Sequence, residues 1–168
     1  MKLTTILGKL LLLVPIVKYK QLVYKFLGVN EVKDSSYKCR YFIGNPRVIG
    51  QYNNIYLHNN AEIERNCFLL AKDRIEIGEN TTLAYGVTIL TGADPNGPLN
   101  KLSKLYPPIK APVKIGKDCW IGANAVILPG VTIGDIVVVA AGSVVTKDIP
   151  SKVMIAGVPA VIKKNLEL

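Results

Sequence analysis

The chain has 168 residues, 49% of them hydrophobic, which suffices for one continuous core and leaves no room for a second domain. Its formal net charge is +9, but the lysines are not interleaved with a recognisable nucleic-acid-reading motif, so we expect no nucleic acid partner. The three cysteines, Cys39, Cys67 and Cys119, are odd in number and show no CxxC spacing, which favours reduced thiols in the cytoplasm over a disulfide framework.

Residues 1–40 differ in character from the rest of the chain. Residues 1–30 carry five lysines and no acidic residue, and residues 10–17 form an apolar run that Pro15 interrupts. This run is too short to span a bilayer, and Lys18 follows it where a signal peptidase would need small residues. Two interpretations stay open: residues 1–28 lie on the inner face of an anionic membrane as short helices, or residues 1–40 form a helical cap.

After this segment an aliphatic residue recurs every six positions. An amphipathic helix repeats every 3.6 residues and a half-buried strand every two, so a step of six indicates a short strand, a turn and a new strand, as in a solenoid. The twelve residues of this column are Leu57, Ile63, Leu69, Ile77, Leu83, Ile89, Ile115, Ile121, Ile127, Ile133, Val139 and Val145.

Two neighbouring columns support the same repeat. The residue three positions after each aliphatic is Asn, Asp or Gly in ten of twelve cases, and these types enter the left-handed backbone region at low cost. The residue after that is mostly small or apolar, as at Ala61, Cys67 and Cys119, and can tuck inside a bend. Each hexapeptide is therefore expected to form its own corner.

The repeat is interrupted twice. The step of eight from Leu69 to Ile77 predicts a two-residue enlargement of one corner, and the step of twenty-six from Ile89 to Ile115 sends residues 91–112 out of the solenoid as a loop. Long excursions from a regular scaffold usually build binding sites.

These columns resemble the hexapeptide pattern of the left-handed parallel β-helix acyltransferases over residues 41–162. The resemblance implies an all-β prism with three hexapeptides in each coil, and it alone supplies the hand, because parallel crossovers are generally right-handed. It also implies a homotrimer in which the excursion loop, residues 91–112, hangs beside the catalytic residue and reaches toward the next subunit. Residues 163–168 follow as a basic C-terminal tail.

A closer resemblance is to the sugar O-acetyltransferases, the group that contains the galactoside and maltose acetyltransferases. Residues 65–70 are similar to a segment whose asparagine lies in the acceptor pocket, so Asn66 is a candidate acceptor ligand as well as a corner residue. Residues 117–134, 139–150 and 156–160 resemble the cofactor-binding coils and imply acetyl-CoA as co-substrate. The implied cofactor-binding residues are Trp120, Ala123, Ala141, Thr146, Lys163 and Lys164. The family's usual basic residue directly after Pro-Ala is absent, because Val161 and Ile162 intervene before the two lysines.

The catalytic histidine of this family is missing. Alignment on the following Asp-Pro puts its position at Ala93, which we favour, and alignment on the preceding threonine puts it at Asp94. Three explanations stay open: alanine replaces a native histidine, Asp94 is the base, or the chain is a catalytically silent homologue that binds sugar or serves as a scaffold. An exposed carboxylate is ordinarily too weak a base to deprotonate a hydroxyl.

The one histidine, His58, follows Leu57 on another side of the prism, and we interpret it as an ordinary outward residue. A single histidine also excludes the zinc site of the hexapeptide-class carbonic anhydrases, and we expect no metal. The expected function is O-acetylation of a sugar hydroxyl in surface polysaccharide or glycolipid synthesis. The expected location is the cytoplasm or the inner face of the membrane.

Overall fold

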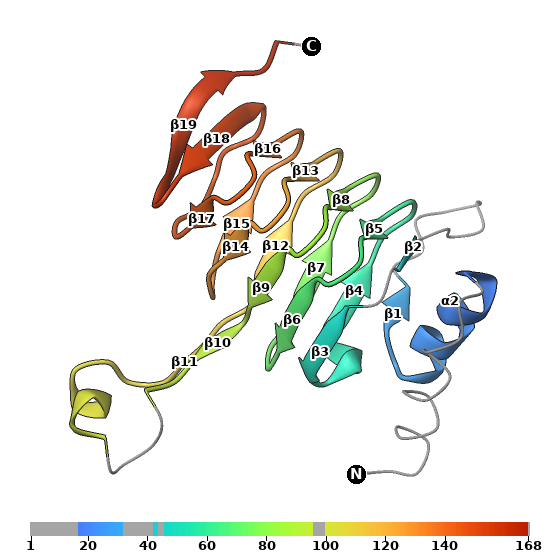
Figure 1. Ribbon diagram of the computed structural model, residues 1–168, viewed down its shortest axis with the longest axis horizontal. Helices are drawn as coiled ribbons and strands as arrows, with labels where there is room; N and C mark the ends of the chain where they lie inside the picture. The colour runs from blue at the N-terminus through green and yellow to red at the C-terminus, as the bar shows by residue number, and fades with distance from the viewer. Residues whose placement is uncertain (1–16, 32–41, 44–45, 96–99, 168) are drawn as a thin grey trace.

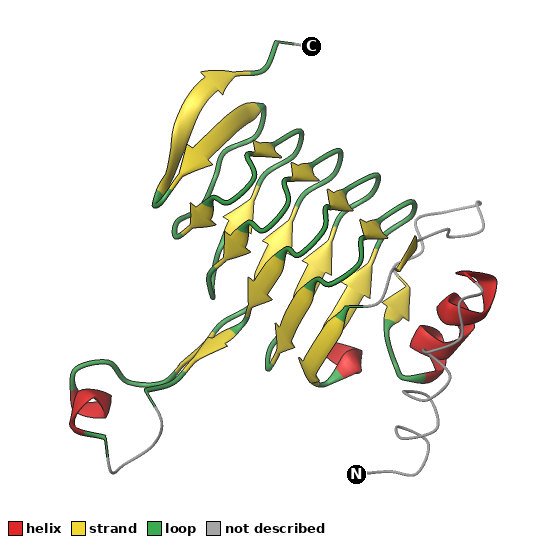
Figure 2. Ribbon diagram, viewed as in Figure 1, coloured by secondary structure: helices red, strands yellow, loops and turns green. Residues whose placement is uncertain are grey.

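The computed structural model describes residues 17–31, 42–43, 46–95 and 100–167. The chain winds as a left-handed parallel β-helix, in which short strands are joined by tight corners and each coil stacks on the one before (Figure 1, Figure 2). Three parallel sheets run the length of the solenoid, so the predicted prism is confirmed.

From β1 to β9 and from β12 to β17 the strands fall into these sheets in rotation; β10 (Gly92–Ala93) and β11 (Ile109–Lys110) pair with each other, and β18 and the antiparallel β19 both join the second sheet. The first sheet holds β1 (Asn30–Glu31), β4 (Ile55–Leu57), β7 (Ile75–Ile77), β12 (Val113–Ile115) and β15 (Thr132–Ile133). The second holds β2 (Phe42–Ile43), β5 (Glu62–Ile63), β8 (Thr82–Leu83), β13 (Trp120–Ile121), β16 (Val138–Val139), β18 (Val153–Gly157) and β19 (Ala160–Asn165). The third holds β3 (Arg47–Gly50), β6 (Phe68–Ala71), β9 (Thr88–Leu90), β14 (Val126–Ile127) and β17 (Val144–Val145).

The pairing register gives the length of each coil. Ile115 pairs with Ile133 and Ile121 with Val139, so an uninterrupted coil takes eighteen residues. Leu57 pairs with Ile77, a step of twenty, and Ile77 pairs with Ile115, a step of thirty-eight. Both interruptions therefore leave the stacking of the aliphatic column intact, as the sequence predicts.

The twelve aliphatic side chains of this column point into the prism and stack on one another along its axis. All twelve are at most 1% exposed, and each coil adds three to the stack. Burial of such a side chain stabilises the fold by roughly 1.5 to 3 kcal/mol, so every coil contributes to holding its neighbours.

Three corners separate the sheets: corner 1 lies between the first and second, corner 2 between the second and third, and corner 3 between the third and first. The predicted corner residues at corners 1 and 2 all have positive φ, including Ile136 at 60°. At corner 3 only Gly130 does, whereas Lys72, Gly92 and Asp148 do not. Corner 3 differs because both interruptions widen it and because the Asp148 carboxylate accepts a hydrogen bond from the backbone of Thr132 instead.

The two ends of the solenoid are closed differently. Helix α2 (Val17–Phe26) lies beside the first coil and buries Val23 and Tyr24, with the Tyr24 ring 6.3 Å from that of Tyr52 in the short 3-10 helix η1 (Tyr52–Asn54). The far end is covered by the antiparallel hairpin β18–β19 (Figure 1). Within the described ranges no helix is long and apolar enough to cross a membrane. The predicted segment 1–16 lies outside the described residues.

Candidate functional site at the second and third corners

Corner 2 brings the predicted acceptor residue and two predicted cofactor residues into one line. Asn66, Gly86, Asn124 and Gly142 stack there, one on each coil, and each is preceded by the side chain that the corner presents outward. The backbone links the stack: the Gly86 amide donates to the Arg65 carbonyl, that of Asn124 to Tyr85, and that of Gly142 to Ala123.

On the coils nearer the C-terminal end, which we call the upper part, corner 2 is lined by small side chains. Ala123 is half-buried and Ala141 is exposed, and Gly122 beneath them has no room for a Cβ, which would collide with the backbone of residues 139–141. A ligand can therefore approach the backbone closely along this line. In the column of outward residues that holds Ala141 and Ala123, the next side chain is that of Tyr85, two coils from Ala141, and the exposed Asn124 follows Ala123 at the corner itself.

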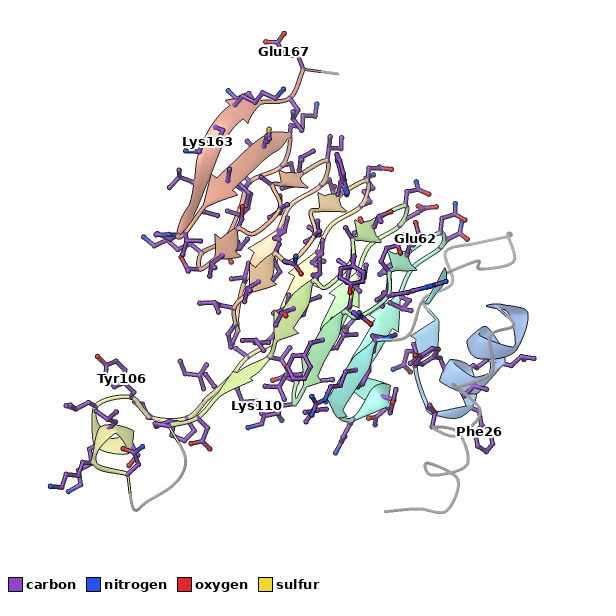
Figure 3. The ribbon with its side chains drawn as sticks, in the orientation of Figure 1. Phe26, Glu62, Tyr106, Lys110, Lys163 and Glu167 are labelled. Carbon is purple, nitrogen blue, oxygen red and sulfur yellow. The ribbon has the colours of Figure 1, made fainter. Side chains whose placement is uncertain are left out.

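The second sheet presents an apolar row beside this corner. Trp120 pairs with Thr82 below and Val138 above, Val138 pairs with Met154, and Met154 pairs with Lys164 on β19. Trp120 is 60% exposed, so its indole is available to a ligand. The row thus begins at an aromatic side chain and ends at an exposed lysine, Lys164. Lys163, which is also exposed, precedes it on β19 (Figure 3).

Thr146 and the proposed histidine position lie at corner 3, one sheet away. Thr146 directly follows β17 and is exposed. Ala93 ends the two-residue strand β10 (Gly92–Ala93), and both Ala93 and Asp94 are exposed. Within one chain the structure therefore does not bring Ala93, Asp94 or Thr146 to the line formed by Asn66, Ala123 and Ala141.

Residues 91–95 and 100–112 belong to an arm that leaves the prism at corner 3. Strand β10 pairs antiparallel with β11 (Ile109–Lys110), and the 3-10 helix η2 (Lys101–Lys104) lies near its tip (Figure 1, Figure 3). Buried Thr91 anchors the arm, because its hydroxyl donates to the Leu70 carbonyl at 2.5 Å and accepts from the Asp73 amide at 2.9 Å. Among the described residues of the arm, the large apolar side chains that are exposed are Leu102, Leu105, Tyr106 and Ile109.

His58 belongs to a charged cluster on the first sheet. Its Nε2 lies 3.1 Å from Oε1 of Glu76, whose other oxygen pairs with Arg74 at 2.8 Å. Burial alone would raise the pKa of Glu76, but the hydrogen bond from His58 and the charges of Arg74 and Lys114 lower it on balance. The guanidinium of Arg74 also lies 4.0 Å from the centre of the Tyr56 ring. Among the described residues no group of three or more His, Cys, Asp or Glu could hold a metal ion.

Comparison with known proteins agrees with the fold. The family model described as the hexapeptide repeat of succinyl-transferase matches residues 112–147. The structure superimposes on a maltose O-acetyltransferase from Clostridium difficile 630 with a TM-score of 0.80 at 31% identity, covering 98% of this chain and 85% of that one. The chain belongs to the hexapeptide-repeat acyltransferase family.

Two further relatives bear on how this hexapeptide-repeat protein works. A hexapeptide-repeat acetyltransferase of Vibrio cholerae O1 biovar eltor, solved in complex with acetyl coenzyme A, is 25% identical with a TM-score of 0.80 and covers 98% of this chain and 86% of that one. The galactoside O-acetyltransferase of Escherichia coli K12 is 39% identical over 123 residues, which are 72% of this chain and 59% of that protein. The chain thus spans less than two thirds of this curated relative.

Two residues next to the candidate site, Met154 and Tyr85, were not predicted from the sequence. Met154 joins the apolar row only because β18 pairs with β16, and Tyr85 joins Asn66 only because successive coils stack. A signal existed for Tyr85, since it breaks a column that holds alanine at positions 123 and 141. The contact between His58 and Glu76 was not predicted either. The two residues are eighteen apart, the length of an uninterrupted coil, but the two-residue enlargement puts Tyr56 in register with Glu76, so His58 meets Glu76 with an offset of two residues.

Proposed function

We propose that this protein transfers an acetyl group from acetyl-CoA to a hydroxyl of a sugar in surface polysaccharide or glycolipid synthesis. The observation that carries the proposal is the alignment of Asn66, Ala123 and Ala141 along corner 2, beside the exposed indole of Trp120. The names of the similar proteins, maltose and galactoside O-acetyltransferases, support this reaction class, and the acetyl coenzyme A complex supports the co-substrate.

The pantetheine arm of the cofactor would lie along corner 2. Small side chains at Ala123 and Ala141 allow it to reach backbone amides and carbonyls, while Trp120 gives it an apolar wall. Lys163 and Lys164, both exposed on β19, offer positive charge to its phosphates. Its thioester would then arrive near Asn66, where the acceptor hydroxyl attacks the thioester carbonyl and coenzyme A leaves as the thiol.

A homotrimer would complete this site. Thr146, Ala93 and Asp94 lie at corner 3, whereas the other candidate residues lie at corner 2 or on the second sheet. If corner 3 of one subunit faces corner 2 of the next, all of them meet between two prisms. The exposed apolar side chains of the arm support this arrangement, because they would be covered by the neighbouring subunit.

The acceptor hydroxyl must lose its proton during the transfer, and a histidine is the side chain best suited to accept it near pH 7. The methyl group of Ala93 cannot do so, which leaves Asp94 as the nearest carboxylate in the arm. Loss of one general base costs roughly 10² to 10⁴ in rate, so slow transfer remains compatible with this sequence. We expect Ala93→His to raise acceptor-dependent release of coenzyme A by about 10² or more.

The experiment that tests the proposal first is calorimetric titration with acetyl-CoA, because it requires neither an acceptor nor a base. We expect a dissociation constant below about 1 mM that is weakened at least tenfold by Ala123→Trp, which fills the line of small residues. Val126→Leu, on the neighbouring sheet, is the matched control. Absence of binding would refute the cofactor site and with it the proposed reaction.

The alternative function, a silent homologue that binds sugar or acts as a scaffold, is favoured by the same alanine at position 93. Acceptor-dependent release of coenzyme A separates the two functions. If Ala93→His and the unchanged protein both bind acetyl-CoA and neither releases coenzyme A with any sugar tested, the silent homologue is the better description.

We also propose that the N-terminal segment contacts an anionic membrane. Helix α2 buries Val23 and Tyr24 but leaves Leu22 and Phe26 each 64% exposed, with Lys25 beside them (Figure 3). Apolar side chains next to a basic one suit the headgroup region of an anionic bilayer. Leu22→Ser with Phe26→Ser should reduce co-sedimentation with phosphatidylserine vesicles severalfold, and no change would oppose membrane contact.

A further inference from the structure

Tyr85 and Asn66 form a polar pair at the lower part of corner 2. The amide nitrogen Nδ2 of Asn66 donates a hydrogen bond to the Tyr85 hydroxyl at 2.6 Å, across two adjacent coils. Both residues are exposed, and 53% of Tyr85 is accessible to solvent, so the pair lies on the surface where a ligand can reach it.

This hydrogen bond sets the orientation of the Asn66 amide. Because Nδ2 is directed to Tyr85, the amide oxygen Oδ1 is turned the other way and can accept a hydrogen bond from a hydroxyl group. The Tyr85 hydroxyl uses a lone pair to accept from Asn66, so its own hydrogen can be donated outward. The pair therefore presents one acceptor and one donor in a defined arrangement.

The backbone holds this arrangement in place. Asn66 has a φ of 59° and is constrained by its corner, and the Tyr85 carbonyl accepts a hydrogen bond from the Asn124 amide on the next coil at 3.0 Å. Gly86, which follows Tyr85, leaves space for the Asn124 side chain, since a Cβ at Gly86 would collide with Oδ1 of Asn124. The tyrosine ring thus projects from a rigid position.

We propose that Tyr85 is a positioning and specificity-determining residue for the acceptor sugar. Its ring supports the apolar face of a pyranose, its hydroxyl donates to one sugar oxygen, and its hydrogen bond orients Asn66 Oδ1 toward a sugar hydroxyl. This inference rests on the proposed function, because it assumes that the acceptor is a sugar and that it meets the acetyl group at the end of the small-residue line on corner 2.

The test compares Tyr85→Phe and Tyr85→Leu with the unchanged protein. Phenylalanine keeps the ring and removes the hydroxyl, whereas leucine removes both; Tyr56→Phe, on the first sheet, is the matched control. Saturation-transfer NMR and affinity titrations would use a panel of methyl glucosides, methyl galactosides and N-acetylhexosamines, with acetyl-CoA titration of every variant as the second measurement.

We expect Tyr85→Phe to weaken sugar binding about fivefold to tenfold and to change the order of preference within the panel, because one donor and the Asn66 orientation are lost. Tyr85→Leu should abolish measurable binding. The acetyl-CoA dissociation constant should stay within about twofold of that of the unchanged protein in both variants, since neither alters the small residues above. Tyr56→Phe should change neither measurement.

The outcomes separate this inference from the proposed function. If acetyl-CoA and sugars bind but Tyr85→Leu leaves sugar affinity and preference unchanged, the role of Tyr85 is refuted and the proposed function stands. If acetyl-CoA binds and no sugar in the panel does, Tyr85 has no role as a sugar ligand. If acetyl-CoA does not bind to the unchanged protein, the proposed function itself fails.

Discussion

Ile136 holds a backbone conformation that suits asparagine or glycine, and it is the one β-branched residue with positive φ among the described residues. Such a residue at φ 60° costs of order 1 kcal/mol or more. Corner 1 elsewhere carries asparagine or aspartate, and a hydrogen-bonded ladder runs from Asn60 through Asn80 to Asp118.

We therefore expect Ile136→Asn to raise the free energy of unfolding by about 1 kcal/mol, measured by urea denaturation. Ile136→Val, which keeps the branched side chain, should give no gain. A loss of stability in Ile136→Asn would mean that the packing of the isoleucine outweighs the backbone strain.

The buried thiol of Cys67 makes the free energy of unfolding depend on pH. Burial raises the pKa of its thiol from 9.0 to about 11, outweighing the backbone hydrogen bonds that lower it. Above pH 9 the unfolded chain loses this proton while the folded chain retains it, so the stabilisation is full below pH 9 and is lost as pH rises toward 11. We expect the free energy of unfolding to fall by about 1 to 2 kcal/mol over that range, and the slope to lessen in Cys67→Ala. An identical slope in the variant would show that Cys67 does not contribute.

The arm is the element whose role depends most on a second copy of the chain. Leu105 and Tyr106 are 74% and 67% exposed near its tip, where the prism of the same chain offers them no cover (Figure 3). If the arm packs on a neighbouring subunit, Leu105→Asp with Tyr106→Asp should weaken self-association by at least tenfold, measured by sedimentation velocity. Lys101→Ser with Lys104→Ser, in η2 of the same arm, is the control. A trimer unaffected by the aspartates would mean that the arm is not part of the interface.

The whole molecule is a stack in which each coil contacts only its neighbours, and its uninterrupted period is eighteen residues. Removing residues 117–134 joins Gly116 to Asp135 and keeps every aliphatic side chain inward, so we expect a folded solenoid of lower thermal stability. The deletion also removes Trp120 and Ala123, so acetyl-CoA binding should be lost.

Removing one residue fewer, residues 117–133, is the control for that deletion. The extra residue falls at corner 1, which carries no enlargement in the column from Leu57 to Val145, so either this corner must distort or the next strand must shift by one residue and turn its aliphatic side chain outward. This variant should therefore have a lower melting temperature by circular dichroism than the eighteen-residue deletion. Equal stability of the two deletions would contradict the period of eighteen.

Much of the fold could be predicted from the sequence because the repeat is local. Each hexapeptide contains its own inward aliphatic, such as Ile121, and its own corner residue, such as Asn124, so both the burial and the positive φ are readable without knowing the neighbours. The prediction of positive φ was wrong at three positions of corner 3, namely Lys72, Gly92 and Asp148. The two insertions change the turn at Lys72 and Gly92, and the Asp148 carboxylate accepts a hydrogen bond from the Thr132 amide.

By itself the sequence determined the period, the inward column and the place of the two interruptions, since all of these follow from residue types at fixed spacing. The candidate residues on the cofactor coils came from the resemblance to the sugar O-acetyltransferases. Only the tertiary structure decided which of them meet. Asn66 and Tyr85 are nineteen residues apart and touch because one coil separates them, while Ala93 and Ala123 belong to different corners of the prism. The physical reason is that stacking converts a separation of about one coil into contact, and no local pattern encodes which insertions lie between two positions.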